Sequence, residues 1–375
     1  MLPVNRVELI LIRLPRVSRF QTAYGDHAIR ETVLARVVMD GVEGWGEFAG
    51  DGPGFSYETP LTAWHILRDY LIPILLAAQI ESPSMCPALF AGVRGHPFAK
   101  AMIEAALWDI AGKQTGQSLH ALLQRLMPEQ TLRDCTQVGV SVGLQTSVAV
   151  LQERLEGLQQ LHLSRIKLKV RPGWDEAAIQ TTRNMFPGVP VMLDGNAAYA
   201  RSEADRLARF DSLGLQMIEQ PFAPDDLLAH RALQGNMLKT PICLDESIHS
   251  VRVAESAIRW SACRAINIKP GRVGGLTQAI ELHNLCADRK VPVYCGGMFE
   301  TGIGKSLNAA LACLPNFLFP SDSVPAERLY SFDLIRNPLR YAESGDLLAP
   351  TSPGLGFEVD MDRVRSITHT SLMLP

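Results

Sequence analysis

Two lysines, separated by a single leucine, lie in a short apolar run, Arg165-Ile-Lys-Leu-Lys-Val170. The run predicts a β-strand, and because side chains alternate along a strand, Lys167 and Lys169 share one face. Burial of both ammonium groups on that face costs free energy, since each loses hydration and repels the other. Taken alone, the pair therefore indicates a solvated edge strand more than a catalytic site.

Four ionisable residues at the ends of later apolar runs change that interpretation. Each one follows a short apolar segment and precedes a loop: Asp194, Glu219, Asp245 and Lys269. If the runs are neighbouring parallel strands, the three carboxylates converge at one end of the sheet, with Lys169 to one side. Converging carboxylates repel unless a cation lies among them, and oxygen ligands suit Mg²⁺, with Mn²⁺ as an alternative. We therefore expect a divalent-metal site rather than three separate helix caps.

A divalent metal beside lysines suits one reaction class, the removal of a proton next to a carboxylate. A lysine with the ordinary pKa of about 10.4 is protonated near pH 7, but like charges and a dry pocket lower its pKa toward the 7–8 that suits a base. The metal would act as a Lewis acid at the oxyanion of the enediolate. We expect Glu246, which follows Asp245, to point away from the metal and to pair with a neighbouring cation.

The elements that must position these residues form a repeat. From about residue 135, β-type runs alternate with helical segments, and the runs cover 137–143, 166–170, 190–194, 217–220, 242–245, 265–269, 291–295 and 317–320. Eight units of about 25 residues predict a (β/α)8 barrel, in which catalytic groups lie at the carboxyl ends of the strands. A doubly wound open sheet is the alternative, but no G-x-G-x-x-G follows a strand.

The first third of the chain has a different pattern. It predicts antiparallel strands over 7–14, 31–39 and 44–47, with a turn at Asp40-Gly41, and then helices over 65–76 and 99–115. Two loops interrupt the strands, 20–27 with Tyr24 and the glycine-rich 50–57 with Phe55, and they are either plain turns or mobile lids. We expect an α+β domain over 1–130, a barrel over 131–329, and a segment 330–375 that packs back onto the first domain.

Composition excludes several classes of partner. The 375 residues carry a net charge of −3 and are 47% hydrophobic, with scattered basic residues, so we expect neither nucleic acid nor an anionic membrane surface as a partner. No apolar run reaches the roughly 18 residues that span a bilayer. The seven cysteines lie far apart without a C-x-x-C pair, which favours reduced thiols and the cytoplasm. We also expect a homo-oligomer.

Taken together, the motifs resemble the enolase superfamily, in its muconate-lactonizing-enzyme subgroup. They extend over nearly the whole chain: Gly44-Trp-Gly-Glu47, Lys167-Leu-Lys169, Asp194-Gly-Asn196, Ile218-Glu-Gln-Pro221, Leu244-Asp-Glu-Ser247 and Asn267-Ile-Lys-Pro-Gly-Arg-Val-Gly-Gly275. A second set is similar to o-succinylbenzoate synthases of the kind that include N-succinylamino acid racemases: His96, Gly139-Val-Ser-Val-Gly143, Gly296-Gly-Met-Phe-Glu-Thr-Gly-Ile-Gly304 and Leu314-Pro-Asn-Phe-Leu-Phe-Pro-Ser-Asp322.

The resemblance implies a fold and a set of roles. The fold is an N-terminal α+β capping domain over a (β/α)7β barrel. Mg²⁺ would bind the three strand-end carboxylates, Lys169 and Lys269 would form the acid/base pair, and Lys167 would assist near the substrate carboxylate. By this resemblance, the loops 20–27 and 50–57 would be lids that close over a small carboxylate substrate. The substrate-binding residues would be Tyr24, Phe55, Ser141, Asn196, Gly297, Met298 and Arg272.

The implied reaction is loss of water from 2-succinyl-6-hydroxy-2,4-cyclohexadiene-1-carboxylate, a step of menaquinone biosynthesis. Racemisation of N-succinyl amino acids by the same two lysines is the alternative. Arg272 either lowers the pKa of Lys269 by its positive charge, which favours Lys269 as a base, or is a surface arginine at the start of a helix. The chain lacks the strand-end His–Asp pair of mandelate-racemase-like relatives and the Asp-x-Asp of dipeptide epimerases. A metal-free Schiff-base aldolase and a non-catalytic barrel are the remaining hypotheses, and the aldolase leaves the carboxylates unexplained.

Overall fold

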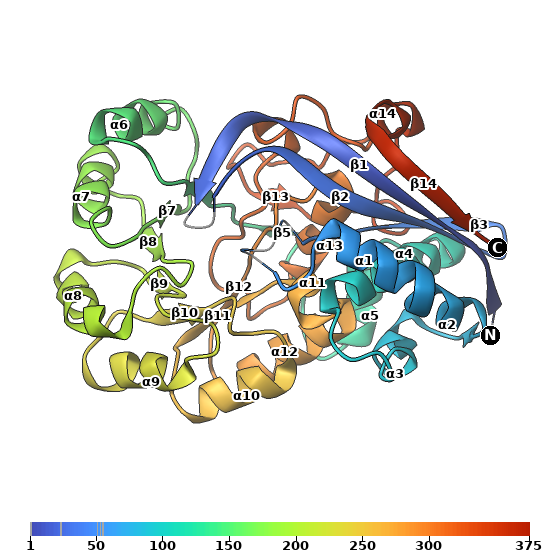
Figure 1. The fold of residues 1–375 in the computed structure, drawn as a ribbon, viewed down its shortest axis with the longest axis horizontal. Helices are drawn as coiled ribbons and strands as arrows, with labels where there is room; N and C mark the ends of the chain where they lie inside the picture. Colours follow the sequence, from blue (N-terminus) through green and yellow to red (C-terminus); the bar gives the residue numbers. More distant parts are fainter. Residues whose placement is uncertain (1, 23–24, 51, 53, 55) are drawn as a thin grey trace.

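An antiparallel sheet forms one side of the molecule. The computed structural model describes residues 2–22, 25–50, 52, 54 and 56–375, with residues 18–22 and 25–27 described by their backbone. Strands β1 (Leu2–Thr22), β2 (Gly25–Met39) and β3 (Val42–Glu47) form a meander, and β1 and β2 arch together across the molecule (Figure 1). Asp40 and Gly41 both have positive φ, 51° and 75°, as the tight β2–β3 hairpin requires.

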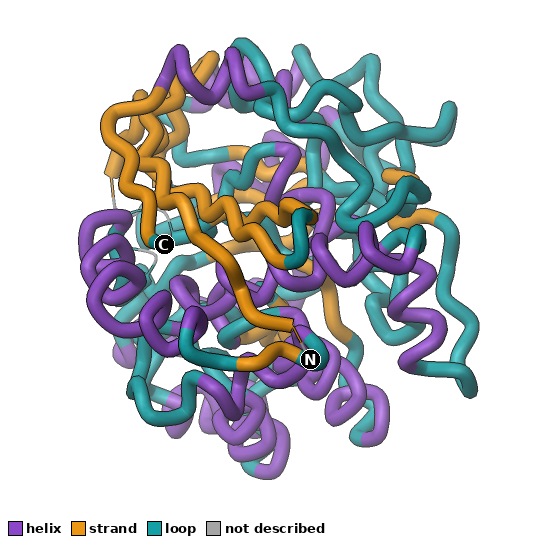
Figure 2. Tube along the Cα trace, turned by 90° about the vertical axis from the view of Figure 1, so that its right-hand side faces the viewer, coloured by secondary structure: helices purple, strands orange, loops and turns teal. Residues whose placement is uncertain are grey.

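The β1–β2 ladder is longer than the sequence indicated. Residues 20–27 were expected to be a loop, but the pairing continues from Phe20 opposite His27 to Thr22 opposite Gly25. At the other edge, β14 (Thr368–Leu374) pairs with β1 in antiparallel register from Val7 opposite Leu374. The C-terminus therefore ends in the sheet that the N-terminus begins, and Figure 2 shows it beside these strands.

One long helix covers this sheet. Helix α4 (Pro97–Thr115) packs against β3, and two glycines of β3 make the contact possible. A Cβ at Gly44 would lie 2.1 Å from the backbone oxygen of Ala106, and one at Gly46 would lie 1.9 Å from that of Met102. The glycines of the motif Gly44-Trp-Gly-Glu47 are thus required for the packing of β3 against α4, in addition to marking the family resemblance. The other elements of this domain are α1 (Pro60–Ile66), the π-helical turn η1 (Leu67–Leu71), α2 (Ile72–Leu76), β4 (Gln79–Ile80), η2 (Pro83–Met85), α3 (Cys86–Leu89) and α5 (Leu119–Leu126).

Seven parallel strands follow in sequence order around the barrel. They are β6 (Val140–Val142), β7 (Ile166–Lys169), β8 (Val191–Asp194), β9 (Ile218–Glu219), β10 (Ile242–Leu244), β11 (Ala265–Ile268) and β12 (Val293–Cys295). The predicted eighth run closes the ring through single bridges, Val293 to Phe317 on one side and Val138 to Ser321 on the other. The predicted (β/α)7β barrel beside an α+β domain is confirmed.

Helices surround the barrel on the outside (Figure 1). They are α6 (Val148–Glu156), α7 (Glu176–Met185), α8 (Ala204–Arg209), α9 (Leu227–Asn236), α10 (Val251–Arg259), α12 (Leu276–Asp288) and α13 (Gly302–Leu311). Short elements complete the chain: β5 (Cys135–Thr136), η3 (Arg201–Glu203), η4 (Phe210–Leu213), α11 (Pro270–Val273), η5 (Ala326–Arg328), β13 (Leu347–Leu348) and α14 (Met361–Ile367). We propose that the two domains meet near residue 130, between α5 and β5.

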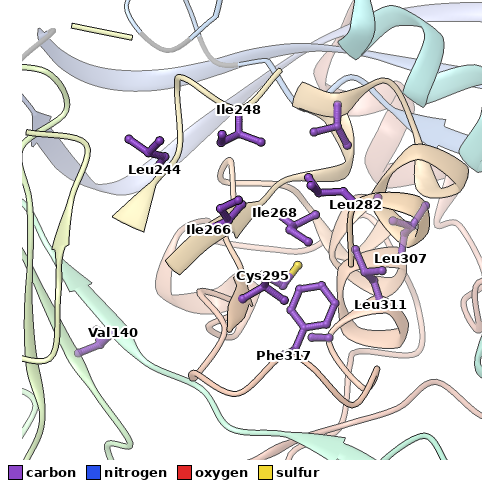
Figure 3. Close-up of a cluster of buried hydrophobic side chains, with 14 of the residues drawn as sticks. Val140, Leu244, Ile248, Ile266, Ile268, Leu282, Cys295, Leu307, Leu311 and Phe317 are labelled. Atoms are coloured by element: carbon purple, nitrogen blue, oxygen red, sulfur yellow. The ribbon is translucent and has the colours of Figure 1, made fainter. Parts of the chain in front are cut away.

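The alternation of the strands separates two cores. Outward side chains such as Leu244, Ile266 and Ile268 pack against helix residues such as Leu282, and Figure 3 shows part of this cluster. Inward side chains form a small interior cluster of Met192, Met217, Cys243, Ala265 and Tyr294. Because the period is two, the residue two positions after each inward apolar residue also points into the barrel. The interior cluster is therefore the floor beneath the strand-end polar residues.

Two expectations from composition can be compared with the fold. Each of the seven cysteines lies in the described part of the chain and is a free thiol, and all but Cys135 are buried. Among the described residues, no helix combines the length and the apolar character needed to cross a bilayer.

Candidate active site

The two lysines of β7 are buried. Lys167 is 3% exposed and Lys169 is 9% exposed, and β7 lies between β6 and β8 rather than at an edge. The solvated-edge interpretation of this strand is therefore wrong. The outward residues Ile166 and Leu168 are buried in the main core, as strand alternation predicts.

Strand register brings the lysines and carboxylates together. Lys169 is opposite Asp194 on β8, and Asp194 is opposite Glu219 on β9. Lys169 donates from Nζ to Oδ2 of Asp194 over 2.5 Å, and Lys269 donates from Nζ to Oδ2 of Asp245 over 2.7 Å. The five strand-end residues predicted from spacing thus form two hydrogen-bonded pairs, and Glu219 interacts electrostatically with members of both.

Lys167 is surrounded by acceptors. Its Nζ lies 2.5 Å from Oδ2 of Asp322, 3.3 Å from Oε2 of Glu219 and 3.7 Å from Oδ2 of Asp194. Burial alone would lower the pKa of Lys167, but the three carboxylates outweigh burial and raise it. The pKa of Lys269 is raised as well, because Asp245 and Glu219 together outweigh burial, so the lowering expected for this lysine is not seen.

Glu219 is the most constrained of the three carboxylates. Tyr294 donates its hydroxyl to Oε2 over 2.6 Å, and Asn267 donates Nδ2 to Oε1 over 2.8 Å. Burial, followed by repulsion from Asp194 and despite the attraction of Lys167, raises the pKa of Glu219 to about 8. The pKa of Asp245 is lowered instead, since Lys269 and Arg272 overcome its burial.

Glu246 does not pair with a cation among the residues that the structure describes, contrary to expectation. Its Oε1 accepts a 2.9 Å hydrogen bond from Nδ2 of Asn196, and Oδ1 of Asn196 accepts a 2.7 Å bond from Nζ of Lys169. Burial raises the pKa of Glu246, and repulsion from Asp245 adds to this. Asn196 therefore links a candidate base to a second, buried carboxyl group.

The three strand-end carboxylates suit a hard divalent cation, although in this structure their oxygens accept hydrogen bonds from the lysines. In the described ranges, no three His, Cys, Asp or Glu side chains lie close enough to ligate one ion as they stand. The chemistry nevertheless fits, because three buried carboxylates on successive strands repel one another, as the raised pKa of Glu219 shows. Asp194, Glu219 and Asp245 are the residues that could hold such an ion.

One cavity contains most of the predicted substrate-binding residues. Its lining includes the three catalytic candidates Lys167, Lys169 and Lys269. It also includes four residues predicted to bind substrate, which are Ser141, Asn196, Gly297 and Met298. The remaining two loop predictions, Tyr24 and Phe55, lie outside the described residues.

Arg272 is close to the site but does not line this cavity. It is 5% exposed, so the surface-arginine interpretation is wrong. Its Nε lies 3.2 Å from Oδ1 of Asp245, and its guanidinium lies 5.8 Å from the centre of the Phe98 ring. Arg272 therefore pairs with Asp245, the carboxylate that also accepts a hydrogen bond from Lys269.

With this geometry in place, two family models account for most of the chain. Residues 7–124 match the N-terminal domain of mandelate racemase and muconate lactonizing enzyme, and residues 150–363 match the enolase C-terminal domain-like model. The chain belongs to this family of the enolase superfamily. Its members include the o-succinylbenzoate synthase of Geobacillus kaustophilus, which is 41% identical over 97% of this chain and 96% of that protein. The N-succinylamino acid racemase of an Amycolatopsis species is also 41% identical, over 94% of each chain.

Solved structures agree with this membership. An enolase-superfamily protein from Listeria innocua matches with a TM-score of 0.93 and 33% identity, covering 100% of this chain and 99% of that one. A member from Enterococcus faecalis matches with a TM-score of 0.90 and 34% identity, covering 99% of both chains.

Within this enolase-superfamily protein, Glu47 connects the capping domain to the barrel. Arg30 donates to Oε1 of Glu47 over 3.0 Å, and Oε2 of Glu47 accepts from the backbone and the hydroxyl of Thr301 over 3.0 and 2.8 Å. Arg30 also donates to the backbone oxygen of Met298. The last residue of the Gly-Trp-Gly-Glu motif thus fixes the loop that lines the cavity after β12.

Sequence reasoning missed Asp322 as a site residue. It appears in the sequence analysis only as the last residue of the motif that runs from Leu314 to Asp322, with no role of its own. In the structure it forms ion pairs with Lys167 and with the buried Arg165, and it lines the cavity. The available signal was its place after the eighth barrel run, the same position that the other strand-end carboxylates occupy.

Proposed function

We propose that this protein is an o-succinylbenzoate synthase, which removes water from 2-succinyl-6-hydroxy-2,4-cyclohexadiene-1-carboxylate in menaquinone biosynthesis. The observation that carries the proposal is the placement of Lys169 at the end of β7 and of Lys269 directly after β11 in one barrel, each hydrogen bonded to a buried strand-end carboxylate. The synthase relatives at 41% identity support the choice of reaction. The hypotheses of an aldolase and of a non-catalytic barrel explain neither the carboxylates nor these relatives.

The lysines have distinct tasks in the proposed reaction. Lys169 removes the proton next to the substrate carboxylate and returns it to the leaving hydroxyl on the same face. Lys269 stays an ammonium and stabilises the negative charge of the enediolate. Lys167, held by Asp322, keeps a positive charge near the substrate carboxylate. When bound by Asp194, Glu219 and Asp245, Mg²⁺ would supply Lewis-acid stabilisation of the same charge.

Racemisation of N-succinyl amino acids is the second candidate, favoured by the racemase from Amycolatopsis at 41% identity. In that reaction one lysine removes the α-proton and the other delivers a proton to the opposite face. Arg272 would bias the outcome, because its charge lies beside the carboxylate that holds Lys269. Both activities in one protein are compatible with the site.

The deciding experiment compares the two reactions on the purified protein with Mg²⁺. Dehydration is followed by formation of the aromatic product, and racemisation by the optical rotation of N-succinyl-phenylalanine. We expect dehydration, with or without racemisation, and loss of both in Lys169→Ala. A protein that does not dehydrate the cyclohexadiene acid would rule out the first proposal. The proposed cytoplasmic location is supported by the free thiols. The proposed homo-oligomer can be tested by light scattering.

A further inference from the structure

The cavity around the lysines extends to a second, basic end. Arg154, Lys305 and Arg328 line it there, and they come from three separate elements, α6, α13 and η5. Arg154 and Arg328 also share the lining of a second, adjoining cavity, so their side chains are neighbours. None of the three was singled out by motif, because they stand on a helix face and in a loop without recognisable spacing.

In the described part of the chain this basic end is not neutralised by close ion pairs, although Asp333, Glu300 and Glu47 attract Lys305 electrostatically. The whole cavity is lined by seven cationic side chains and by the carboxylates of Glu300 and Asp322. Both carboxylates are already engaged: Glu300 accepts from the backbone of Met298 over 2.7 Å, and Asp322 is held by Lys167. Among the described residues, no carboxylate forms an ion pair with the three cations of the basic end.

Arg154 and Arg328 repel each other, and Lys305 is a buried cation in the lining of the same cavity. Lys305 is 3% exposed and donates from Nζ to the backbone oxygen of Val324 over 2.8 Å. Burial lowers the pKa of Lys305 to about 8. Burial, and next the charge of Arg154, lower the pKa of Arg328. An anion placed at this end would relieve the repulsion between Arg154 and Arg328 and would accept hydrogen bonds from their guanidinium groups.

We propose that Arg154, Arg328 and Lys305 form an anion subsite that binds the second, remote carboxylate of the substrate. The inference rests on the proposed function, since both candidate substrates carry a succinyl arm that ends in a carboxylate. The reacting end of the substrate lies at Lys169 and Lys269, and the arm follows the same cavity to the arginines. Arginine suits this task because its planar fork of donors matches a carboxylate. The subsite therefore selects succinyl over uncharged acyl groups.

The test compares N-succinyl-phenylalanine with N-acetyl-phenylalanine, which differs by lacking the remote carboxylate. Arg154→Gln, Arg328→Gln and the double variant are compared with Arg259→Gln, which removes the same charge from a surface groove over α9 and α10. For each arginine we expect the KM for the succinyl substrate to rise about tenfold, as for a lost charge-assisted hydrogen bond, with kcat little changed. The acetyl substrate and the Arg259→Gln control should be unaffected. Equal losses on both substrates, or no loss, would overturn the subsite.

Calorimetric binding to the Mg²⁺-supplemented protein separates this inference from the proposed reaction. If the protein neither dehydrates the cyclohexadiene acid nor racemises N-succinyl-phenylalanine, but binds the succinyl compound more tightly than the acetyl compound, and the double variant loses that difference, the subsite stands and the proposed function fails. If the protein is active but the wild type binds both compounds equally, the proposed function stands and the subsite is refuted. Thermal unfolding of each variant checks that its fold is intact.

Discussion

Lys269 donates a hydrogen bond of 2.7 Å to Oδ2 of Asp245, which pairs a candidate acid–base group with a candidate metal ligand. Lys169 and Asp194 form the equivalent pair on β7 and β8. A carboxylate oxygen that accepts from an ammonium group has less electron density for a cation, so lysine position and metal binding are coupled. The barrel places these groups at the ends of adjacent strands, where their side chains form hydrogen bonds.

Metal binding should depend on the three strand-end carboxylates. We expect chelation to abolish activity and Mg²⁺ to restore it, and Asp245→Asn or Glu219→Gln to weaken Mg²⁺ binding at least tenfold in calorimetric titration. Asp362→Asn, at an exposed position in α14, is the matched control and should bind normally. Full activity in the presence of a chelator would show that the carboxylates serve another purpose.

The contact between β3 and α4 should not tolerate a side chain at Gly46. A Cβ there would lie 1.9 Å from the backbone oxygen of Met102, and backbone atoms on both sides cannot move independently. We expect Gly46→Ala to lower the free energy of unfolding by about 3 kcal/mol, the scale of overpacking in a core. Chemical denaturation measures this, with Gly92→Ala as control, since a Cβ at Gly92 meets nothing within 4 Å. Equal stability of the two variants would refute the packing argument.

A pH dependence of stability should arise from Glu58. This side chain is buried and accepts from the backbone of Phe98 and Ala99 at the start of α4. Burial raises its pKa from 4.5 to about 7, despite these hydrogen bonds. The folded protein thus binds a proton that the unfolded chain releases, so this contribution is complete below pH 4.5 and is lost as the pH rises through about 7.

Denaturation of wild type and Glu58→Gln at pH 5 and pH 8 checks this sign. The wild type should lose on the order of 3 kcal/mol of unfolding free energy relative to the variant over this interval. Glu129→Gln, at an exposed position, should follow the wild type. A wild type that gains stability relative to Glu58→Gln as the pH rises would contradict the raised pKa.

The sequence predicted the parts of the site that depend on strand alternation. Lys167 and Lys169 share a face, and Asp194, Glu219 and Asp245 end successive strands, so their convergence required only the barrel topology. The pairing of Lys167 with Asp322 could not be read in the same way, because the two residues are 155 positions apart and meet only when the ring closes.

Other features depend on side-chain packing that spacing does not encode. The burial of Arg272 and the hydrogen bond from Asn196 to Glu246 follow from how α11 and the loop after β8 pack. The pKa of Lys269 is raised, contrary to expectation, because the carboxylates of Asp245 and Glu219 outweigh burial and like charges. Arg154 and Arg328 could not be predicted as site residues, because they lie in no recognisable motif and only the fold places them at the cavity.

The central claim is that Lys169 acts as a base in either reaction, whereas Lys269 must exchange a proton only in racemisation. Lys169→Ala should therefore abolish both activities. Arginine keeps a positive charge but cannot serve as a base, so Lys269→Arg should reduce racemisation by at least a factor of about 100 and dehydration far less. The most direct measurement is the ratio of the two rates in Lys269→Arg relative to wild type. We expect a large shift of this ratio toward dehydration, and an equal loss of both activities would contradict the assignment of Lys269.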